Sequence, residues 1–224
     1  ENKWSTKHLH RLICTSRAYR QSSAKTKLVA SKDSDNVLLS RMPMRRLDAE
    51  ELHDGLLAIA GRLNMRMGGE PDEVQVFGRG YVTGKPGDEG WRRSVYIRQR
   101  RIHTMTLLET FDLPTMNPNC VERVNSTVVQ QPLYLLHDKV IYGLARQLAS
   151  QIQKETKGIE PSIRLAYQKI VNRPPSKKEL ASMIESVGEL ERQFVEAKET
   201  GQRNKALAAV CHALFNSAAF LYVD

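Results

Sequence analysis

The chain has 224 residues, of which 41% are hydrophobic and 26% are charged. This length allows one large domain or two small ones, and the composition is that of an ordinary folded protein. Disordered, collagen-like and disulfide-dense classes are therefore excluded. The net charge of +9 is uneven, because residues 1–101 carry 20 basic and 12 acidic side chains, against 14 and 13 in the remainder. This asymmetry favours an anionic partner for the first half, either nucleic acid, acidic polysaccharide or a membrane surface, with an unspecialised basic surface as the alternative.

The ends of the chain bear on export and membrane insertion. The sequence opens at Glu1 inside an amphipathic pattern, with no signal peptide, so we expect it to be part of a longer protein. The uncharged run 206–223 just reaches the length of a membrane span. His212, Asn216 and Ser217 interrupt this run, and alanine supplies much of it. We therefore expect a buried terminal helix and no membrane span.

The first 67 residues contain two predicted helices. Ser5 can cap a helix that runs to about Arg17, whereas residues 22–44 are rich in small and polar side chains and predict an irregular connection. Asp48 and Glu51 have the spacing of a capping box. They predict a helix from Asp48 to Met67, which the glycine pair at 68 and 69 would end.

The next segment predicts the β structure of the chain and its main candidate binding site. Residues 68–90 are rich in glycine and predict loops with one or two short strands, and residues 92–101 alternate like a strand. Arginine dominates that strand, so an anion is expected beside it, either a ligand or an internal carboxylate such as Glu109 or Asp112. The candidate ligand-binding residues are Arg92, Arg93, Tyr96, Arg98, Arg100 and Arg101.

The second half of the sequence is helical throughout. A long apolar stripe extends from Leu133 to Ile152, Pro161 suits the first turn of a second helix, and Ser176 with Glu179 predicts another capping box. A last helix follows Gly201. The predicted fold is mainly α with a small β element (α+β). Residues 1–127 form an irregular and helical half with a short sheet, and residues 128–224 form an antiparallel helix bundle packed with it as one domain.

The common catalytic and metal-binding motifs are absent from the sequence. No HExxH, GxSxG, paired CxxC or DxDxDG pattern occurs. His10 and Cys14 are four residues apart on one helix face, but two ligands do not make a zinc site, so no metal is expected. The chain lacks CxxCH, so no haem or other cofactor is expected within it. If the chain is an enzyme, Asp112 paired with Glu109 or Asp48 is the candidate acid–base set.

Short blocks of residues, in order along nearly the whole chain, carry a family resemblance. They are Trp4-Ser5, residues 9–13, 19–23, 35–36, 38–41, 46–50, 92–96, 111–114, 126–127, 172–175, 216–217 and 220–224. Together these blocks resemble the planctomycete family known as domain of unknown function 1553. The sequence departs from the family pattern at Pro132, His137 and Ala219, where alanine, asparagine and glutamate are usual. A glutamate at the last position could pair with an arginine of the basic strand, so that pairing is in doubt here.

The resemblance implies a setting for the chain and supplies no catalytic residues. Members of this family look like C-terminal parts of large exported planctomycete proteins, often with a cytochrome-c-like domain and sometimes with carbohydrate-binding modules. It implies an extracytoplasmic location and other domains of the same protein as partners. The leading hypothesis is a non-catalytic structural or interaction module that binds an anionic polysaccharide through the basic strand. The alternatives are a polysaccharide-processing enzyme domain and, with less support, a nucleic-acid-binding module.

Overall fold

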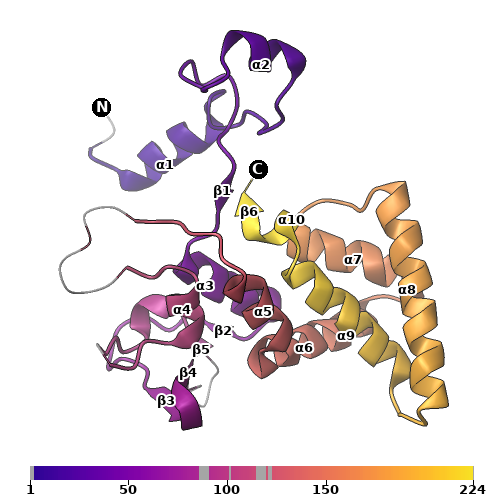
Figure 1. Cartoon of the computed structure of the whole chain (residues 1–224). Coiled ribbons are helices and arrows are strands. Elements are labelled where there is room, and N and C mark those ends of the chain that lie inside the picture. The colour runs from indigo at the N-terminus through magenta and orange to yellow at the C-terminus, as the bar shows by residue number, and fades with distance from the viewer. Residues whose placement is uncertain (1–2, 86–90, 101, 115–119, 121–122, 224) are drawn as a thin grey trace. The chain divides into compact units, whose positions relative to one another are not determined.

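The chain forms two compact units in a computed structural model that describes residues 3–85, 91–100, 102–114, 120 and 123–223. The first unit comprises Glu1–Arg46 and Tyr222–Asp224, and the second comprises Leu47–Leu221. Helices dominate, and the short strands form two-stranded sheets, which confirms the predicted mainly α class with a small β element (Figure 1). Residue 127, where the sequence places the boundary between halves, lies inside the second unit.

The first unit contains two short helices and one pair of strands. Helix α1 (Thr6–Thr15) begins as predicted, because the Ser5 hydroxyl accepts a hydrogen bond from the amide of His8 at 3.3 Å. Helix α2 (Lys27–Lys32) lies in the stretch that was predicted to be irregular, so the prediction is wrong there. Thr26 caps this helix, and its hydroxyl accepts a hydrogen bond from the amide of Val29, which has no backbone acceptor within the helix. Strand β1 (Arg45–Arg46) pairs antiparallel with β6 (Tyr222–Val223).

The second unit opens with helix α3 (Ala49–Ile59), and its capping box of Asp48 and Glu51 is confirmed. The predicted end at Met67 is wrong. Gly61 ends the helix with a φ of +64°, and the side-chain amide of Gln151 donates to the carbonyl of Ala60 at 3.1 Å. A Cβ at Gly61 would lie 2.7 Å from that amide nitrogen and would displace the Gln151 side chain, and the positive φ favours glycine at this position.

Two small sheets follow α3. Strand β2 (Leu63–Asn64) pairs in parallel with β5 (Trp91–Arg92). Strands β3 (Val74–Phe77) and β4 (Tyr81–Gly84) form an antiparallel hairpin closed by a 3₁₀ turn at Gly78–Gly80. This hairpin confirms the short strands that were predicted in the glycine-rich segment.

The predicted basic strand over residues 92–101 is wrong over residues 93–100, and residue 101 lies outside the described residues. A 3₁₀ turn, η2 (Ser94–Tyr96), follows β5, with hydrogen bonds from the Tyr96 amide to the Arg93 carbonyl and from the Ile97 amide to the Ser94 carbonyl. The Ser94 amide also donates to the Asp54 carboxylate of α3 at 2.7 Å. This long-range bond holds a turn where the alternating sequence pattern favours a strand. As a result, Val95 points to solvent and Ile97 is buried.

The rest of the second unit is helical. Its helices are α4 (Thr106–Thr110), α5 (Gln130–His137), α6 (Lys139–Glu155), α7 (Ile159–Val171), α8 (Lys177–Glu196), α9 (Gln202–Phe215) and α10 (Ala218–Leu221). Helices α6 to α9 pack on one another as a bundle, as predicted (Figure 1). The capping box of Ser176 and Glu179 is confirmed. The prediction of a single helix along the stripe from Leu133 to Ile152 is wrong, because Asp138 ends α5 and caps α6.

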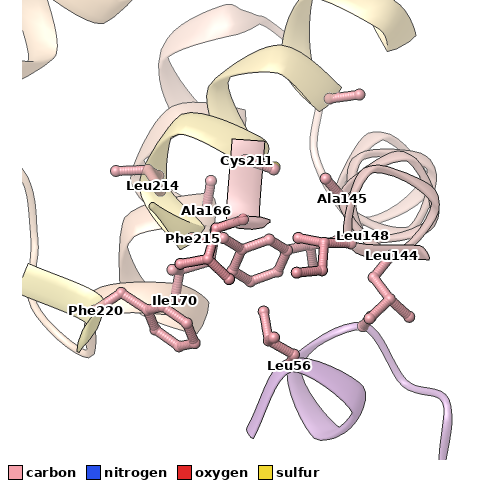
Figure 2. Packing of buried hydrophobic residues seen from close by; sticks show 14 of the residues in the cluster. Leu56, Leu144, Ala145, Leu148, Ala166, Ile170, Cys211, Leu214, Phe215 and Phe220 are labelled. Atoms are coloured by element: carbon pink, nitrogen blue, oxygen red, sulfur yellow. The ribbon is translucent and has the colours of Figure 1, made fainter. Parts of the chain in front are cut away.

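The hydrophobic core of the second unit joins α3 to the bundle. Figure 2 shows Phe215 among side chains from α3, α6, α7 and α10. Its ring centroid lies 5.5 Å from that of Phe220. The residues around it include Leu56 of α3 and Leu148 of α6, both fully buried. Among the described residues, no helix combines the length and the apolar character needed to cross a membrane.

Candidate functional site

Arg92, the first candidate ligand-binding residue, is buried and used internally. Its Nε and one terminal nitrogen donate to Asp72 Oδ1 at 2.8 and 2.6 Å, and the other terminal nitrogen donates to the Gly68 carbonyl at 2.7 Å. It also donates to the carbonyl of Glu70, and its guanidinium lies 4.7 Å from the centroid of the Tyr96 ring. The Asp72 carboxylate raises the pKa of Arg92. These bonds close the loop over residues 68–72, so Arg92 organises the fold.

The other arginines of this segment retain more exposed charge. Arg98 and Arg100 pair with the two carboxylate oxygens of Glu73 at 2.9 and 3.0 Å, and all three side chains are partly exposed. Arg93 is exposed, with a terminal nitrogen 3.7 Å from the sulfur of Met65. Arg101 lies outside the described residues. Two guanidinium groups thus share one carboxylate, which leaves one unit of positive charge at this edge.

The three candidate catalytic carboxylates are held by different local structures. Asp48 caps α3 and lies 3.7 Å from Arg123. Asp112 has a φ of +64° and accepts bonds from the amide and hydroxyl of Ser126 at 2.8 and 2.7 Å. Glu109 is exposed on α4. Asp48 and Asp112 therefore each hold a helix end or a turn, which is a structural task.

A mixed-charge hollow of about 580 Å³ lies between α3 and the η2 turn. Arg123 makes a two-pronged ion pair with Glu50 in its wall, at 2.8 and 2.7 Å. The hydrogen bonds from Arg123 lower the pKa of Glu50. Arg93 and Asp54 also line this hollow. Glu50 occupies both terminal nitrogens of Arg123, so that guanidinium is already paired and is not available to an anion.

A cleft of about 630 Å³ that the sequence analysis missed lies between the β3–β4 hairpin and the junction of α5 with α6. Aromatic rings form much of its wall, and those of Phe77 and Tyr81 lie 5.8 Å apart between centroids. Its lining residues are Phe77, Gly78, Tyr81, Thr83, Thr106, Tyr134, His137, Asp138, Lys139 and Val140. The cleft thus combines apolar walls with hydroxyl, imidazole and ammonium groups.

Asp138 anchors this cleft from a buried position. One carboxylate oxygen accepts from the amides of Val140 and Ile141 at 2.8 and 2.9 Å, and the other accepts from the Tyr81 hydroxyl at 2.6 Å. Burial and the bond to Asp138 raise the pKa of Tyr81 to about 12. Burial, followed by the charge of Asp138, also raises the pKa of Tyr134. Both phenols therefore stay protonated at neutral pH and act as hydrogen-bond donors.

A local signal for this cleft exists in the sequence. Asp138 is followed by an apolar helical pattern, and aspartate is among the most common helix caps. The continuous stripe from Leu133 to Ile152 concealed this cap, although Leu133 and Leu136 prove to be largely exposed. The meeting of Asp138 with Tyr81, 57 residues earlier in the chain, has no counterpart in a local pattern.

Among the described residues, no group of three or more His, Cys, Asp or Glu side chains is placed to hold a metal ion.

Comparisons with known proteins identify the family of the chain. No curated protein matches the sequence, and no solved structure matches the fold. One family model, described as a protein of unknown function (DUF1553), matches residues 1–187. Since this match covers most of the sequence, and agrees with the ordered blocks identified above, the chain belongs to the DUF1553 family.

Proposed function

We propose that the chain is a non-catalytic recognition module of a larger exported, extracytoplasmic protein, and that it binds an acidic carbohydrate in the 630 Å³ cleft. The observation that carries this proposal is the composition of the cleft wall, in which aromatic rings alternate with hydroxyl groups and a cation. Its volume lies within the range of roughly 300–1,000 Å³ that is typical of small-molecule sites. The partners of the module are the other domains of the larger protein, and the family resemblance is the support for that setting.

The chemistry of the cleft suits a sugar ring with an acidic substituent. The faces of Phe77 and Tyr81 can pack against the C–H groups of a pyranose. Lys139 is exposed at the cleft and supplies the positive charge that a uronate or sulfate requires. The Asp138 carboxylate already accepts hydrogen bonds from two amides and a phenol. Lys139 is therefore the charged group of the cleft that would bind the acidic substituent of the ligand.

The basic segment is a second candidate site for the same class of ligand. Arg98 and Arg100 share the carboxylate of Glu73 and keep one net positive charge. Arg93 is exposed beside them in sequence. At this second site Arg92 would not contact the ligand, because its N–H groups already donate to Asp72 and to backbone carbonyls. A carbohydrate bound here would rest mainly on charge and would weaken steeply with salt.

A non-catalytic role is supported by the placement of the carboxylates. Asp48 caps a helix and Asp112 holds a turn, so both carboxylates already make structural hydrogen bonds. Glu109 is exposed on α4 and stands apart from both structural tasks. The enzyme alternative keeps these three residues as its acid–base candidates. It predicts sugar release, which a binding module does not produce.

The test is a glycan-array screen of the full chain at low and physiological salt, followed by calorimetry with a uronic oligosaccharide. Phe77→Ala should weaken binding about fivefold, since an aromatic contact contributes roughly 1 kcal/mol. Lys139→Gln should weaken binding of acidic sugars and spare neutral ones. Val76→Ala is the matched control, because Val76 is equally exposed on the same strand and does not line the cleft.

Each outcome of this test decides between the candidates. Binding that is lost in the Phe77 variant and kept in the Val76 variant supports the cleft. Binding that is lost only in Arg98→Ala with Arg100→Ala moves the site to the basic segment. Sugar release during the screen contradicts the non-catalytic role, and absence of binding to every glycan overturns the proposal.

A further inference from the structure

The positive charge of the protein is concentrated in the first unit. Residues 1–46 and 222–224 contain eleven basic and four acidic side chains, which gives +7 of the net charge of +9 for the chain. The second unit, more than three times larger, carries the remaining +2. A field of this strength in so small a unit attracts an anionic surface.

Helix α1 in this unit has two chemically different faces. At 100° per residue, Leu9, Leu12 and Ile13 fall on one side of the helix, and Lys7 and Arg11 fall on the opposite side. No residue of α1 is buried, and the side chain of Leu12 is 59% exposed. The helix therefore has an apolar face that no part of its own unit covers.

Other apolar side chains of the first unit are also exposed. Trp4, immediately before the α1 cap, is fully exposed, as are most of Leu28 and the run Val37-Leu38-Leu39. Asp33 holds that run in a turn, because its carboxylate accepts bonds from the Leu38 amide and the Ser40 hydroxyl. Fixed exposed apolar groups of this number mark an interaction surface on a folded protein.

We propose that the first unit binds peripherally to an anionic lipid bilayer, with α1 lying in the plane of the headgroups. Leu9, Leu12 and Ile13 enter the boundary between headgroups and acyl chains, and Lys7 and Arg11 face the anionic headgroups. Membrane-surface helices combine these two signals, an apolar face and a basic face. A nucleic acid or an acidic polysaccharide would use the charge alone, and it would leave the apolar face in water.

The test is co-sedimentation of the full chain with vesicles of phosphatidylcholine alone, or of phosphatidylcholine with about one-third phosphatidylglycerol. Binding is expected with the anionic vesicles only. Leu12→Gln should reduce partitioning by tenfold or more, and Lys7→Gln should reduce it by about fivefold, the value of one charge near such a surface. Thr15→Gln is the matched control, since Thr15 lies on the polar side of α1.

A second measurement follows the position of the helix. The fluorescence of Trp4 should shift to the blue on vesicle binding, and Trp4→Phe should remove that shift, because the other tryptophan, Trp91, lies in the second unit. Binding to a soluble sulfated polymer that is unaffected by Leu12→Gln would overturn the proposal in favour of a polyanion site. A Trp4 emission that is already blue-shifted without vesicles would show that protein covers this part of the unit, which also overturns the proposal. Failure to bind either vesicle has the same consequence.

Discussion

Replacement of Asp138 by alanine tests the central contact of the cleft. The Asp138 carboxylate caps α6 through the amides of Val140 and Ile141, and it accepts the short bond from the Tyr81 hydroxyl. Alanine removes all three bonds at once. It also leaves the Tyr81 hydroxyl, which is partly buried, without its acceptor.

The expected loss of stability follows from these bonds. Loss of a helix cap costs about 1 kcal/mol, and a hydrogen bond to a charged group contributes about 1.5–3 kcal/mol. The Asp138→Ala variant should therefore lose about 3 kcal/mol in the free energy of unfolding. In a unit of this size, that loss lowers Tm by about 6–12 °C. Tyr81→Phe removes only the phenol bond and should cost about half as much.

The assay is urea denaturation of the two single variants and the double variant, followed by far-ultraviolet circular dichroism. Because Asp138 and Tyr81 are in direct contact, the double-mutant cycle should show a coupling free energy of about 1 kcal/mol or more. Asp138→Asn is the control, since its side-chain oxygen can still cap α6. It should recover most of the cap contribution and little of the bond from Tyr81.

Two results would refute this reasoning. A loss below about 0.5 kcal/mol for Asp138→Ala is the size of an ordinary surface substitution, and it would mean that the carboxylate organises nothing. Additive effects in the double variant would mean that Tyr81 and Asp138 act independently. In either case the cleft would lose its anchor, and the binding proposal would lose its geometric basis.

Three further predictions concern a thiol, a carboxylate and the core. Burial raises the pKa of Cys211 to about 12, so at about pH 8 this thiol should resist a disulfide reagent that modifies the exposed Cys14, as thiol titration would show. Arg173 and the capping box lower the pKa of Glu179 from 4.5 to about 2, so its stabilisation holds above pH 4.5 and is lost as the pH falls toward 2. In urea titrations over that range, Glu179→Gln should remove this part of the pH dependence. Leu148→Ala, in the fully buried centre of α6, should cost about 2–5 kcal/mol on denaturation.

Each of these predictions has a clear contrary result. Rapid modification of Cys211 in the native protein would show that α9 opens to solvent. An unchanged acid-denaturation profile in the Glu179 variant would show that the ion pair contributes no net stability. A loss below about 1 kcal/mol for Leu148→Ala would contradict the close packing around Phe215 in Figure 2.

Sequence patterns predicted several helix starts that depend on local interactions, although the equally local caps at Thr26 and Asp138 were missed. The caps at Ser5, Asp48 and Ser176 lie within three residues of the amides they satisfy, so their spacing predicted three helix starts correctly. The apolar periodicity predicted a helical second half for the same reason. The family was also identifiable from ordered blocks of residues, and the family comparison confirmed it.

Several predictions failed where the structure depends on residues far apart in the chain. The η2 turn is held by Asp54, forty residues before Ser94, and the Ala60 carbonyl at the end of α3 is satisfied by Gln151, about ninety residues away. Gly61, which ends α3, is by contrast a local signal that the prediction missed. The candidate site shows the same limit. Arginine content predicted an anion beside Arg92, but only the fold shows that this anion is Asp72.

Composition and short-range patterns specify the helical class, three of the helix starts, the family and the basic character of the first half, because each is encoded in composition or in neighbours within a few residues. Tertiary packing sets which charges are free and where a cleft forms. Those properties depend on which distant segments meet, and a side chain such as Asp138 acquires its partners only when the β3–β4 hairpin packs against the junction of α5 and α6. A bond across 57 residues is fixed by packing, which a local pattern does not specify.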